Sequence, residues 1–127
     1  MPLLGFKKQF APAVENGLLV HPFASIPIKR QTIRAKRRDG RNPRPGEKLY
    51  LYTGLRTKQC LKLGEAICKS VEEIFIAWRG ICLAGVWLTA EEQSAMAIAD
   101  GFTTFQEMAD FFRKEHGEDF WGLLIKW

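Results

Sequence analysis

The chain has 127 residues, the length of one domain spanning residues 1–127, and its 46% hydrophobic content is enough for one continuous core. No stretch approaches the roughly 20 uncharged apolar residues that a membrane helix needs, and the N-terminus lacks an apolar signal segment, so we expect a cytoplasmic protein without membrane contact. Cys60, Cys68 and Cys82 are odd in number and lack metal-ligand spacing, and only two histidines accompany them. We therefore expect no disulfide framework, no metal and no other cofactor.

The net charge of +5 is concentrated in residues 29–44. This segment contains eight basic residues and one acid, Asp39, so all of the net positive charge of the chain lies within it. Such a segment is typical of a surface that neutralises phosphates, which predicts contact with nucleic acid. The alternative interpretation is a solvated basic loop without a partner.

The first third of the chain predicts a short helix and one strand. Apolar residues at helical spacing predict a helix over residues 11–16, with Gly17 placed to end it. Two prolines make residues 18–28 an extended connection. A strand can follow over residues 29–36, and glycine and proline then exclude a strand from residues 37–46, which we interpret as a loop.

The middle of the chain predicts strands. Leucine and tyrosine alternate within residues 47–54, which predicts a strand with the two tyrosines on one face. Residues 61–76 form a longer apolar stretch that fits either one bent strand with Gly64 at the bend or two shorter strands. Residues 81–88 predict a further strand.

The last third predicts two helices and a final strand. Thr89 opens a capping box, which predicts a helix through Ala99. A second helix begins after Thr104 and ends before Gly117, and the apolar residues 120–127 predict a strand within the sheet. This order of elements predicts an α+β fold, a mostly antiparallel β-barrel with flanking helices.

Three motifs occur in a fixed order along the chain. They are K-x-x-T-x-R over residues 29–34, P-G-E-x-L-x-L over residues 45–51 and A-D-G-F over residues 99–102. From about residue 6 to the C-terminus the chain resembles the ASCH domain, a relative of the PUA RNA-binding module. Residues 46–60 also resemble ASCH proteins carried by phages and prophages. The resemblance implies a PUA-like barrel.

The resemblance also implies a candidate catalytic set. Some ASCH proteins resemble the bacterial N4-acetylcytidine amidohydrolase, whose proposed set is a lysine, a threonine three residues later and a glutamate in the late helical region. Lys29 and Thr32 match the first two, and Asp100, one methylene shorter than glutamate, stands at the third. Thr32 would be the nucleophile, Lys29 the base, and Asp100 the acid that orients Lys29 or protonates the leaving amine.

Strand geometry restricts this interpretation. Lys29 and Thr32 are three residues apart, which places them on opposite faces of an extended strand. Both reach one pocket only if a bend, bulge or turn intervenes. Burial and neighbouring arginines would lower the pKa of Lys29 and leave some neutral amine. In the simpler alternative, Lys29 and Thr32 only contact phosphates, and Asp100 only ends its helix.

The basic segment and its neighbours form a candidate nucleic-acid surface. Tyr50 and Tyr52 either stack on bases or belong to the core. Arg56 and Lys58 either extend the basic cleft or form an exposed turn. The predicted contact residues are Arg30, Arg34, Lys36, Arg37, Arg38, Arg41, Arg44, Tyr50, Tyr52, Arg56 and Lys58.

Three functions are compatible with these observations. We favour binding of RNA, or of a modified nucleoside, because binding needs only the charge and the cleft that the sequence indicates. The second is hydrolysis of an acyl group from a modified cytidine. The third is a phage-borne interaction factor whose basic loop binds an acidic host protein.

Overall fold

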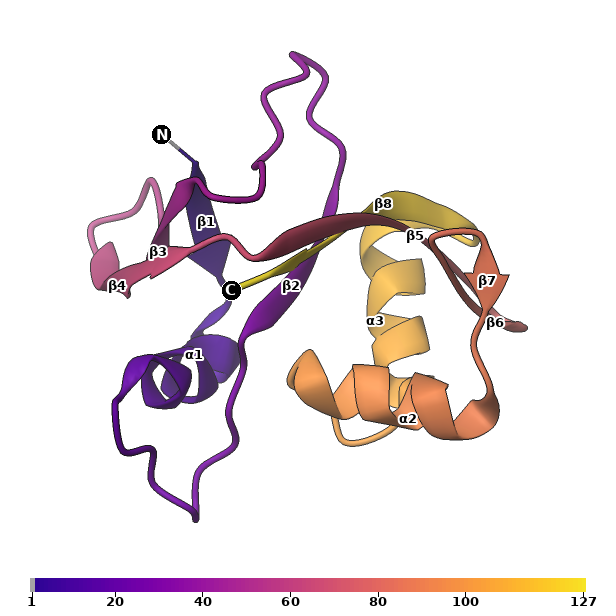
Figure 1. The fold of residues 1–127 in the computed structure, drawn as a ribbon, viewed down its shortest axis with the longest axis horizontal. Coiled ribbons are helices and arrows are strands. Elements are labelled where there is room, and N and C mark those ends of the chain that lie inside the picture. The colour runs from indigo at the N-terminus through magenta and orange to yellow at the C-terminus, as the bar shows by residue number, and fades with distance from the viewer. Residues whose placement is uncertain (1) are drawn as a thin grey trace.

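The computed structural model describes residues 2–127 of the protein (Figure 1). These residues form an α+β fold with two mostly antiparallel sheets and three α-helices. The elements are β1 (Leu3–Phe6), the 3₁₀ turn η1 (Lys8–Phe10), α1 (Ala11–Leu18), β2 (Gln31–Ala35), β3 (Lys48–Thr53), β4 (Leu61–Ile67), β5 (Ser70–Ala77), β6 (Gly80–Leu83), β7 (Val86–Trp87), α2 (Ala90–Ala99), α3 (Phe105–His116) and β8 (Phe120–Lys126). Within this described part of the chain, no helix is both long and apolar enough to cross a membrane.

The strands are divided between two sheets. One has three strands in the order β1-β3-β4, and the other has five in the order β2-β8-β5-β6-β7. Every neighbouring pair is antiparallel except β1 and β3, which are parallel. The sheets meet at Cys68, whose amide donates to the Glu47 carbonyl beside β3, while the amide of Lys69 donates to the Lys126 carbonyl of β8. The chain therefore passes from β4 into β5 without a break in hydrogen bonding.

The strands β1 and β2 are free edges of these two sheets. No ladder joins them among residues 2–127, but the Arg34 guanidinium on β2 donates a hydrogen bond to the Gly5 carbonyl on β1. The ladders thus form two sheets with an opening between two edges. Side chains from both edges line this opening, and it contains the candidate site.

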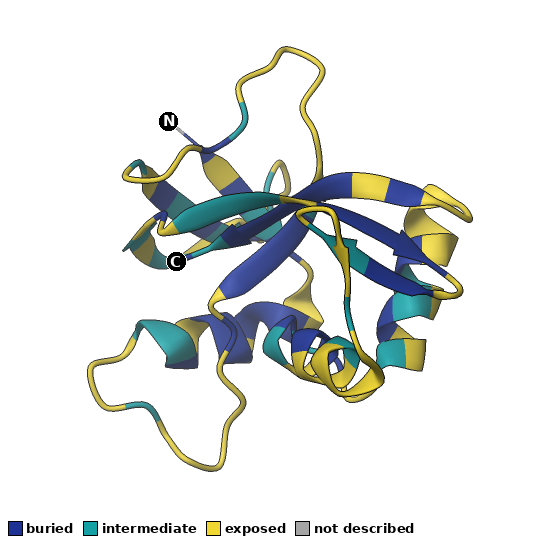
Figure 2. Ribbon diagram, turned by 45° about the vertical axis from the view of Figure 1, so that its right-hand side comes forward, coloured by how far each residue is buried: buried dark blue, intermediate teal, exposed yellow. Residues whose placement is uncertain are grey.

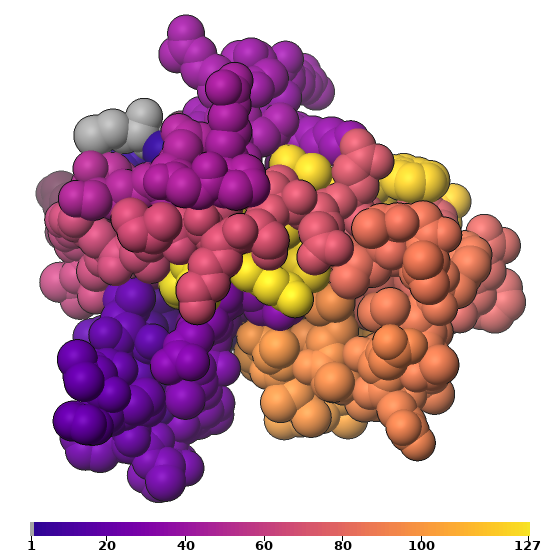
Figure 3. All heavy atoms as spheres, in the orientation of Figure 1, coloured from indigo at the N-terminus to yellow at the C-terminus, as the bar shows by residue number. Residues whose placement is uncertain are grey.

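The burial pattern confirms the predicted alternation in β3. Leu49 and Leu51 are fully buried, whereas Tyr50 and Tyr52 on the other face are half-buried. Exposed residues gather in two long connections, one between α1 and β2 and one between β2 and β3, which project from the fold (Figures 2 and 3). The buried core lies between the sheets and the helices.

Both late helices begin at the caps that the sequence predicts. The Thr89 hydroxyl accepts from the Glu92 amide, and the Glu92 carboxylate accepts from the Thr89 amide, which forms the reciprocal capping box. The Thr104 hydroxyl likewise accepts from the Glu107 amide at the start of α3, and Gly117 follows its last turn. The final strand is confirmed as well, and it pairs with both β2 and β5.

The structure adds one strand, decides between two alternatives and corrects one strand prediction. The strand β1 was not predicted, because its parallel pairing with the distant β3 leaves no local pattern. Residues 61–76 form two strands, the second of the predicted alternatives. Residues 81–88 form the hairpin of β6 and β7, because Ala84 and Gly85 adopt left-handed conformations, with φ of 49° and 85°, and reverse the chain.

The first helix continues through Gly17 to Leu18 and does not end at residue 16. The glycine instead permits close packing, because a Cβ at Gly17 would lie 2.9 Å from the Lys29 carbonyl oxygen. The Lys29 amide donates to the Ala13 carbonyl at 3.0 Å, and Arg30 Nε donates to the Gly17 carbonyl at 3.0 Å. Helix α1 thereby fixes the chain immediately before β2.

Candidate functional site

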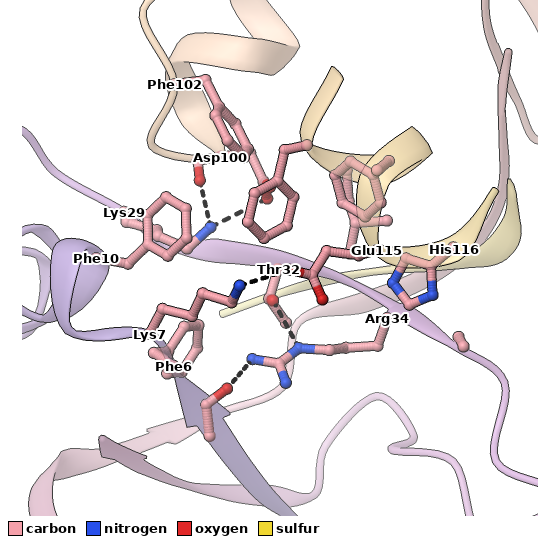
Figure 4. A pocket seen from close by; sticks show the side chains of 15 residues that line it. Phe6, Lys7, Phe10, Lys29, Thr32, Arg34, Asp100, Phe102, Glu115 and His116 are labelled. Atoms are coloured by element: carbon pink, nitrogen blue, oxygen red, sulfur yellow. Dashed lines mark hydrogen bonds and ion pairs between the residues drawn. The ribbon is translucent and has the colours of Figure 1, made fainter. Parts of the chain in front are cut away.

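A cavity of about 270 Å³ lies at the opening between β1 and β2 (Figure 4). We call it the Lys29 cavity. Its wall combines segments that are distant in the sequence: the two edge strands, the turn before α1, the end of α2 and one side of α3. The residues discussed below that line it are Gly5, Phe6, Lys7, Phe10, Lys29, Thr32, Arg34, Ala35, Asp100, Phe102, Phe111, Phe112, Glu115 and His116.

Lys29 and Asp100 form a buried ion pair in this cavity. Lys29 Nζ lies 3.1 Å from Asp100 Oδ1 and also donates to the Asp100 carbonyl, so two of its three N–H donors are used. Lys29 is only 2% exposed and Asp100 only 4%. A pair removed from water to this degree needs good geometry to offset the cost of desolvation.

The convergence of Lys29 and Thr32 has a local cause. Lys29 lies before Gln31, the first residue of β2, so the alternation of an extended strand does not apply between Lys29 and Thr32. Both side chains line the same cavity. The two side chains can therefore converge without a bulge in β2, because a hydrogen bond to α1 holds residue 29 outside the strand.

Thr32 and Arg34 are linked on one face of β2. Arg34 Nε donates to Thr32 Oγ1 at 2.9 Å, and another N–H of the guanidinium donates to the Gly5 carbonyl. Thr32 is 4% exposed, and Arg34 is half-buried. Arg34 therefore lies in the wall of the opening, and its predicted phosphate contact stays a prediction.

Gln31 is a further member of the site that no sequence signal indicated. Its amide Nε2 donates to Asp100 Oδ1 at 3.4 Å and contacts the sulfur of Met96 at 3.3 Å. Asp100 therefore accepts hydrogen bonds from two buried side chains at the end of α2. A glutamine beside the matched lysine has no periodic or spacing signal, so this role could not be predicted from the chain alone.

Aromatic rings surround the cations of the cavity. Lys29 Nζ lies 5.0 Å from the ring centre of Phe10 and 5.9 Å from that of Phe6, and the Arg34 guanidinium lies 4.9 Å from the Phe6 ring. Phe102 packs edge-on against Phe10 at 5.4 Å. These three phenylalanine rings belong both to the buried core and to the cavity wall.

Burial acts on both members of the Lys29–Asp100 pair. Loss of hydration lowers the pKa of Lys29 below its ordinary value of 10.5; Asp100 opposes this change, and the charge of Arg34 adds to it. Loss of hydration also raises the pKa of Asp100 above 3.8, against the effect of Lys29. The two pKa values approach each other, so Lys29 loses its proton at a lower pH than a lysine in water does.

A second ion pair lies at the rim of the cavity. Lys7 Nζ and Glu115 Oε1 are 2.6 Å apart, and both side chains are exposed to solvent. Lys7 also lies 4.9 Å above the Phe111 ring, and His116 stacks on Phe112. Figure 4 shows both ion pairs among the side chains that line the cavity.

The basic loop, residues 36–47, has a different character. Its arginines are exposed, and its ion pairs are solvated: Lys36 with Glu73 at 2.7 Å and Arg37 with Asp39 at 3.8 Å. A shallow recess of about 300 Å³ on this loop is lined by Pro2, Arg37, Arg41, Asn42, Arg44 and Glu47. Arg38 is exposed beside this recess.

Several predicted contact residues lie away from the Lys29 cavity. Arg30 is exposed and donates to α1. Tyr50 and Tyr52 are half-buried on β3, where Lys62 lies 5.4 Å above the Tyr50 ring, and Lys58 is exposed in the turn after β3. Of the connection between α1 and β2, residues 19–30, only Lys29 lines the cavity.

Among residues 2–127, no group of three or more His, Cys, Asp or Glu side chains is placed to hold a metal ion. Comparison with known proteins found no match to this chain among family models, curated proteins or solved structures. The roles of Lys29, Thr32 and Asp100 therefore stay predictions, and their interpretation depends on the geometry described above.

Proposed function

We propose that this chain is an ASCH-type RNA-binding protein that places one nucleobase of a single-stranded RNA, or a modified nucleoside, in the Lys29 cavity. The observation that carries the proposal is the buried Lys29–Asp100 pair facing a cavity beside Thr32 and Arg34. We extend the proposal to the fold: the two sheets correspond to a PUA-like barrel that is open between β1 and β2.

The buried pair supports recognition better than it supports stability. Replacing a buried ion pair with apolar residues of similar volume is often neutral or stabilising, so stability alone gives little reason for Lys29 and Asp100. Lys29 has one N–H donor left, and Asp100 Oδ2 has no partner among the hydrogen bonds of the described residues. Together these groups offer a donor and an acceptor for the polar edge of a base.

The size and lining of the cavity suit one planar ring. Ligand pockets commonly measure about 300–1,000 Å³, and the 270 Å³ of the Lys29 cavity is close to the lower end of that range. The rings of Phe6, Phe10 and Phe102 offer apolar surface for a base. A base must leave a duplex to enter such a cavity, which favours a single-stranded ligand.

The basic loop supplies the sequence-independent part of the affinity. Arg37, Arg38, Arg41 and Arg44 are exposed, as phosphate contacts must be. If each contacts one phosphate of a single strand, the slope of log affinity against log salt is about −3, from about −0.7 per contact.

Fluorescence anisotropy of a labelled ten-nucleotide RNA tests this proposal. We expect an affinity that falls steeply between low and physiological salt, and competition by excess unlabelled single strand but not by the matching duplex. A slope near zero contradicts the proposal, and it favours an acidic protein as the partner of the basic loop.

One observation favours hydrolysis as a second candidate function. Thr32 Oγ1 already accepts a hydrogen bond from Arg34 Nε, which would stabilise negative charge developing on that oxygen. In the reaction, neutral Lys29 takes the Thr32 proton, the threonine oxygen attacks the acyl carbon, and the proton passes to the leaving amine as the C–N bond breaks. Water then cleaves the acyl-threonine ester and releases the acid.

Incubation with N4-acetylcytidine tests the second candidate. Thr32→Val keeps the shape of the side chain and removes the hydroxyl, so product formation should fall to background. Thr53→Val is the matched control, because Thr53 is a buried threonine whose hydroxyl donates to the Phe6 carbonyl outside the reacting set. Equal loss in both variants, or no product with the unaltered chain, contradicts hydrolysis while leaving RNA binding in place.

A further inference from the structure

A second cavity, of about 370 Å³, shares part of its wall with the Lys29 cavity. Arg34 and Ala35 of β2 line both cavities. The floor of the second cavity is apolar and includes Leu4 of β1 and both Leu123 and Ile125 of β8. We call it the Arg56 cavity, and the two cavities lie along the same opening between the edge strands.

The charge of the Arg56 cavity is of one sign. Three arginines, Arg34, Arg37 and Arg56, line it, and its wall includes no acidic residue. Arg37 also lines the recess on the basic loop, so cationic groups continue from the Lys29 cavity through the Arg56 cavity to the loop. An apolar floor with a cationic rim complements a ligand that has both a flat ring and a phosphate.

The turn after β3 holds Arg56 in an uncommon conformation. Its φ is 66°, a region that residues other than glycine rarely occupy. The turn is braced by hydrogen bonds from the Thr57 amide and hydroxyl to the Gly54 carbonyl. Backbone strain of this kind persists where the surrounding structure enforces it, and here it accompanies an arginine in a cavity wall.

Arg34 lines both cavities, and only some of its N–H donors are used within the protein. A guanidinium has five N–H donors, and Arg34 uses one for Thr32 and one for the Gly5 carbonyl, which leaves three. The remaining donors belong to the terminal nitrogens, whose planar arrangement fits two oxygens of one phosphate.

We propose that the Arg56 cavity binds the nucleotide next to the one whose base occupies the Lys29 cavity, with Arg34 at the phosphate that joins them. This inference rests on the proposed function and restricts the class of ligand. The ligand is an oligonucleotide of at least two residues, and a free nucleoside fills only half of the site.

Calorimetric titration with two kinds of probe, a nucleoside and a pair of dinucleotides, tests the inference. The probes are N4-acetylcytidine and the dinucleotides in which N4-acetylcytidine is joined through its 3′ or its 5′ phosphate to uridine. We expect one dinucleotide to bind at least about tenfold tighter than the nucleoside, equivalent to about 1.4 kcal/mol. Arg56→Gln should remove most of that gain and change nucleoside affinity less than about twofold.

Arg79→Gln is the matched control. Arg79 is an exposed arginine between β5 and β6 that lines neither cavity, so its loss should leave both affinities unchanged. If the nucleoside binds but neither dinucleotide binds more tightly, or if Arg56→Gln keeps the full gain, the inference is wrong and the proposed function stands. If neither probe nor the ten-nucleotide RNA binds, both are wrong.

Discussion

The Lys29 cavity and the basic loop belong to one stretch of basic sequence but place their cations in opposite environments. Lys29 is 2% exposed and held by Asp100, whereas Arg37, Arg38, Arg41 and Arg44 are exposed in the loop. Buried cations are costly and have fixed positions, which suits discrimination among ligands, and solvated cations give affinity that salt screens. The density of charge in a sequence therefore does not reveal the role of each charge.

The largest expected effect comes from breaking the buried pair. Asp100→Ala should destabilise the fold by about 3–5 kcal/mol, because it leaves Lys29 buried without a counter-charge. Chemical denaturation measures this loss. Glu115→Gln, which breaks the exposed pair with Lys7, should cost far less, because solvent already screens that pair. Similar losses in both variants would remove the distinction between the two environments.

A double variant distinguishes loss of charge from loss of fold. Lys29→Met together with Asp100→Leu replaces the pair with apolar side chains of similar volume, and it should lie within about 2 kcal/mol of the unaltered chain. RNA affinity should still fall in this variant. Unchanged RNA affinity in a stable double variant would exclude the pair from recognition.

The next effect concerns the position of the exposed charge. Replacing Arg37, Arg38 and Arg41 with glutamine should weaken RNA binding about tenfold or more at low salt and reduce the salt slope by about 2. The control variant replaces three basic residues away from the loop, Arg79, Arg113 and Lys114, and removes the same net charge. If the two variants lose affinity equally, net charge and not the loop attracts the RNA.

The pH dependence of stability reports on the buried pair of Lys29 and Asp100. Between the lowered pKa of Lys29 and 10.5, the unfolded chain binds a proton that the folded chain lacks, so the free energy of unfolding rises with pH by at most about 1.4 kcal/mol per unit. Asp100 has the opposite sign: stability falls as pH rises from 3.8 through its raised pKa.

Denaturation at a series of alkaline pH values up to 10.5 checks this rise. The Lys29→Met, Asp100→Leu variant should lack it, because neither group then titrates. Parallel curves for the variant and the unaltered chain would mean that Lys29 keeps an ordinary pKa.

The smallest effect is expected at the tyrosines of β3. Tyr50 and Tyr52 line neither the Lys29 cavity nor the Arg56 cavity, so changing either to leucine should alter RNA affinity less than about twofold. Anisotropy with the same RNA measures this. Loss of a stacking contact worth about 1–3 kcal/mol would instead place bases on the face of β3.

Local signals predicted the elements whose cause is local. The capping box of α2, the alternation of β3 and the apolar strand β8 all depend on neighbouring residues. The strand β1 and the hairpin turn at Ala84 were missed, because one depends on pairing with a distant strand and the other on a left-handed alanine.

The candidate site was predictable only in part. The motif resemblance indicated Lys29, Thr32 and Asp100, and the structure brings these three to one cavity. Gln31 and the aromatic wall come from segments that converge only in the folded chain. Arg34 was expected at a phosphate, and it lies where the two cavities meet.

The most direct test of the central claim compares the salt dependence of RNA binding in two variants. Thr32→Val should lower RNA affinity by about fivefold to tenfold at every salt concentration, which is the effect of losing one hydrogen bond. The slope of log affinity against log salt should not change. The triple arginine variant of the basic loop should reduce the slope. If Thr32→Val has no effect, or if both variants change the slope equally, the Lys29 cavity does not hold a base and the account is contradicted.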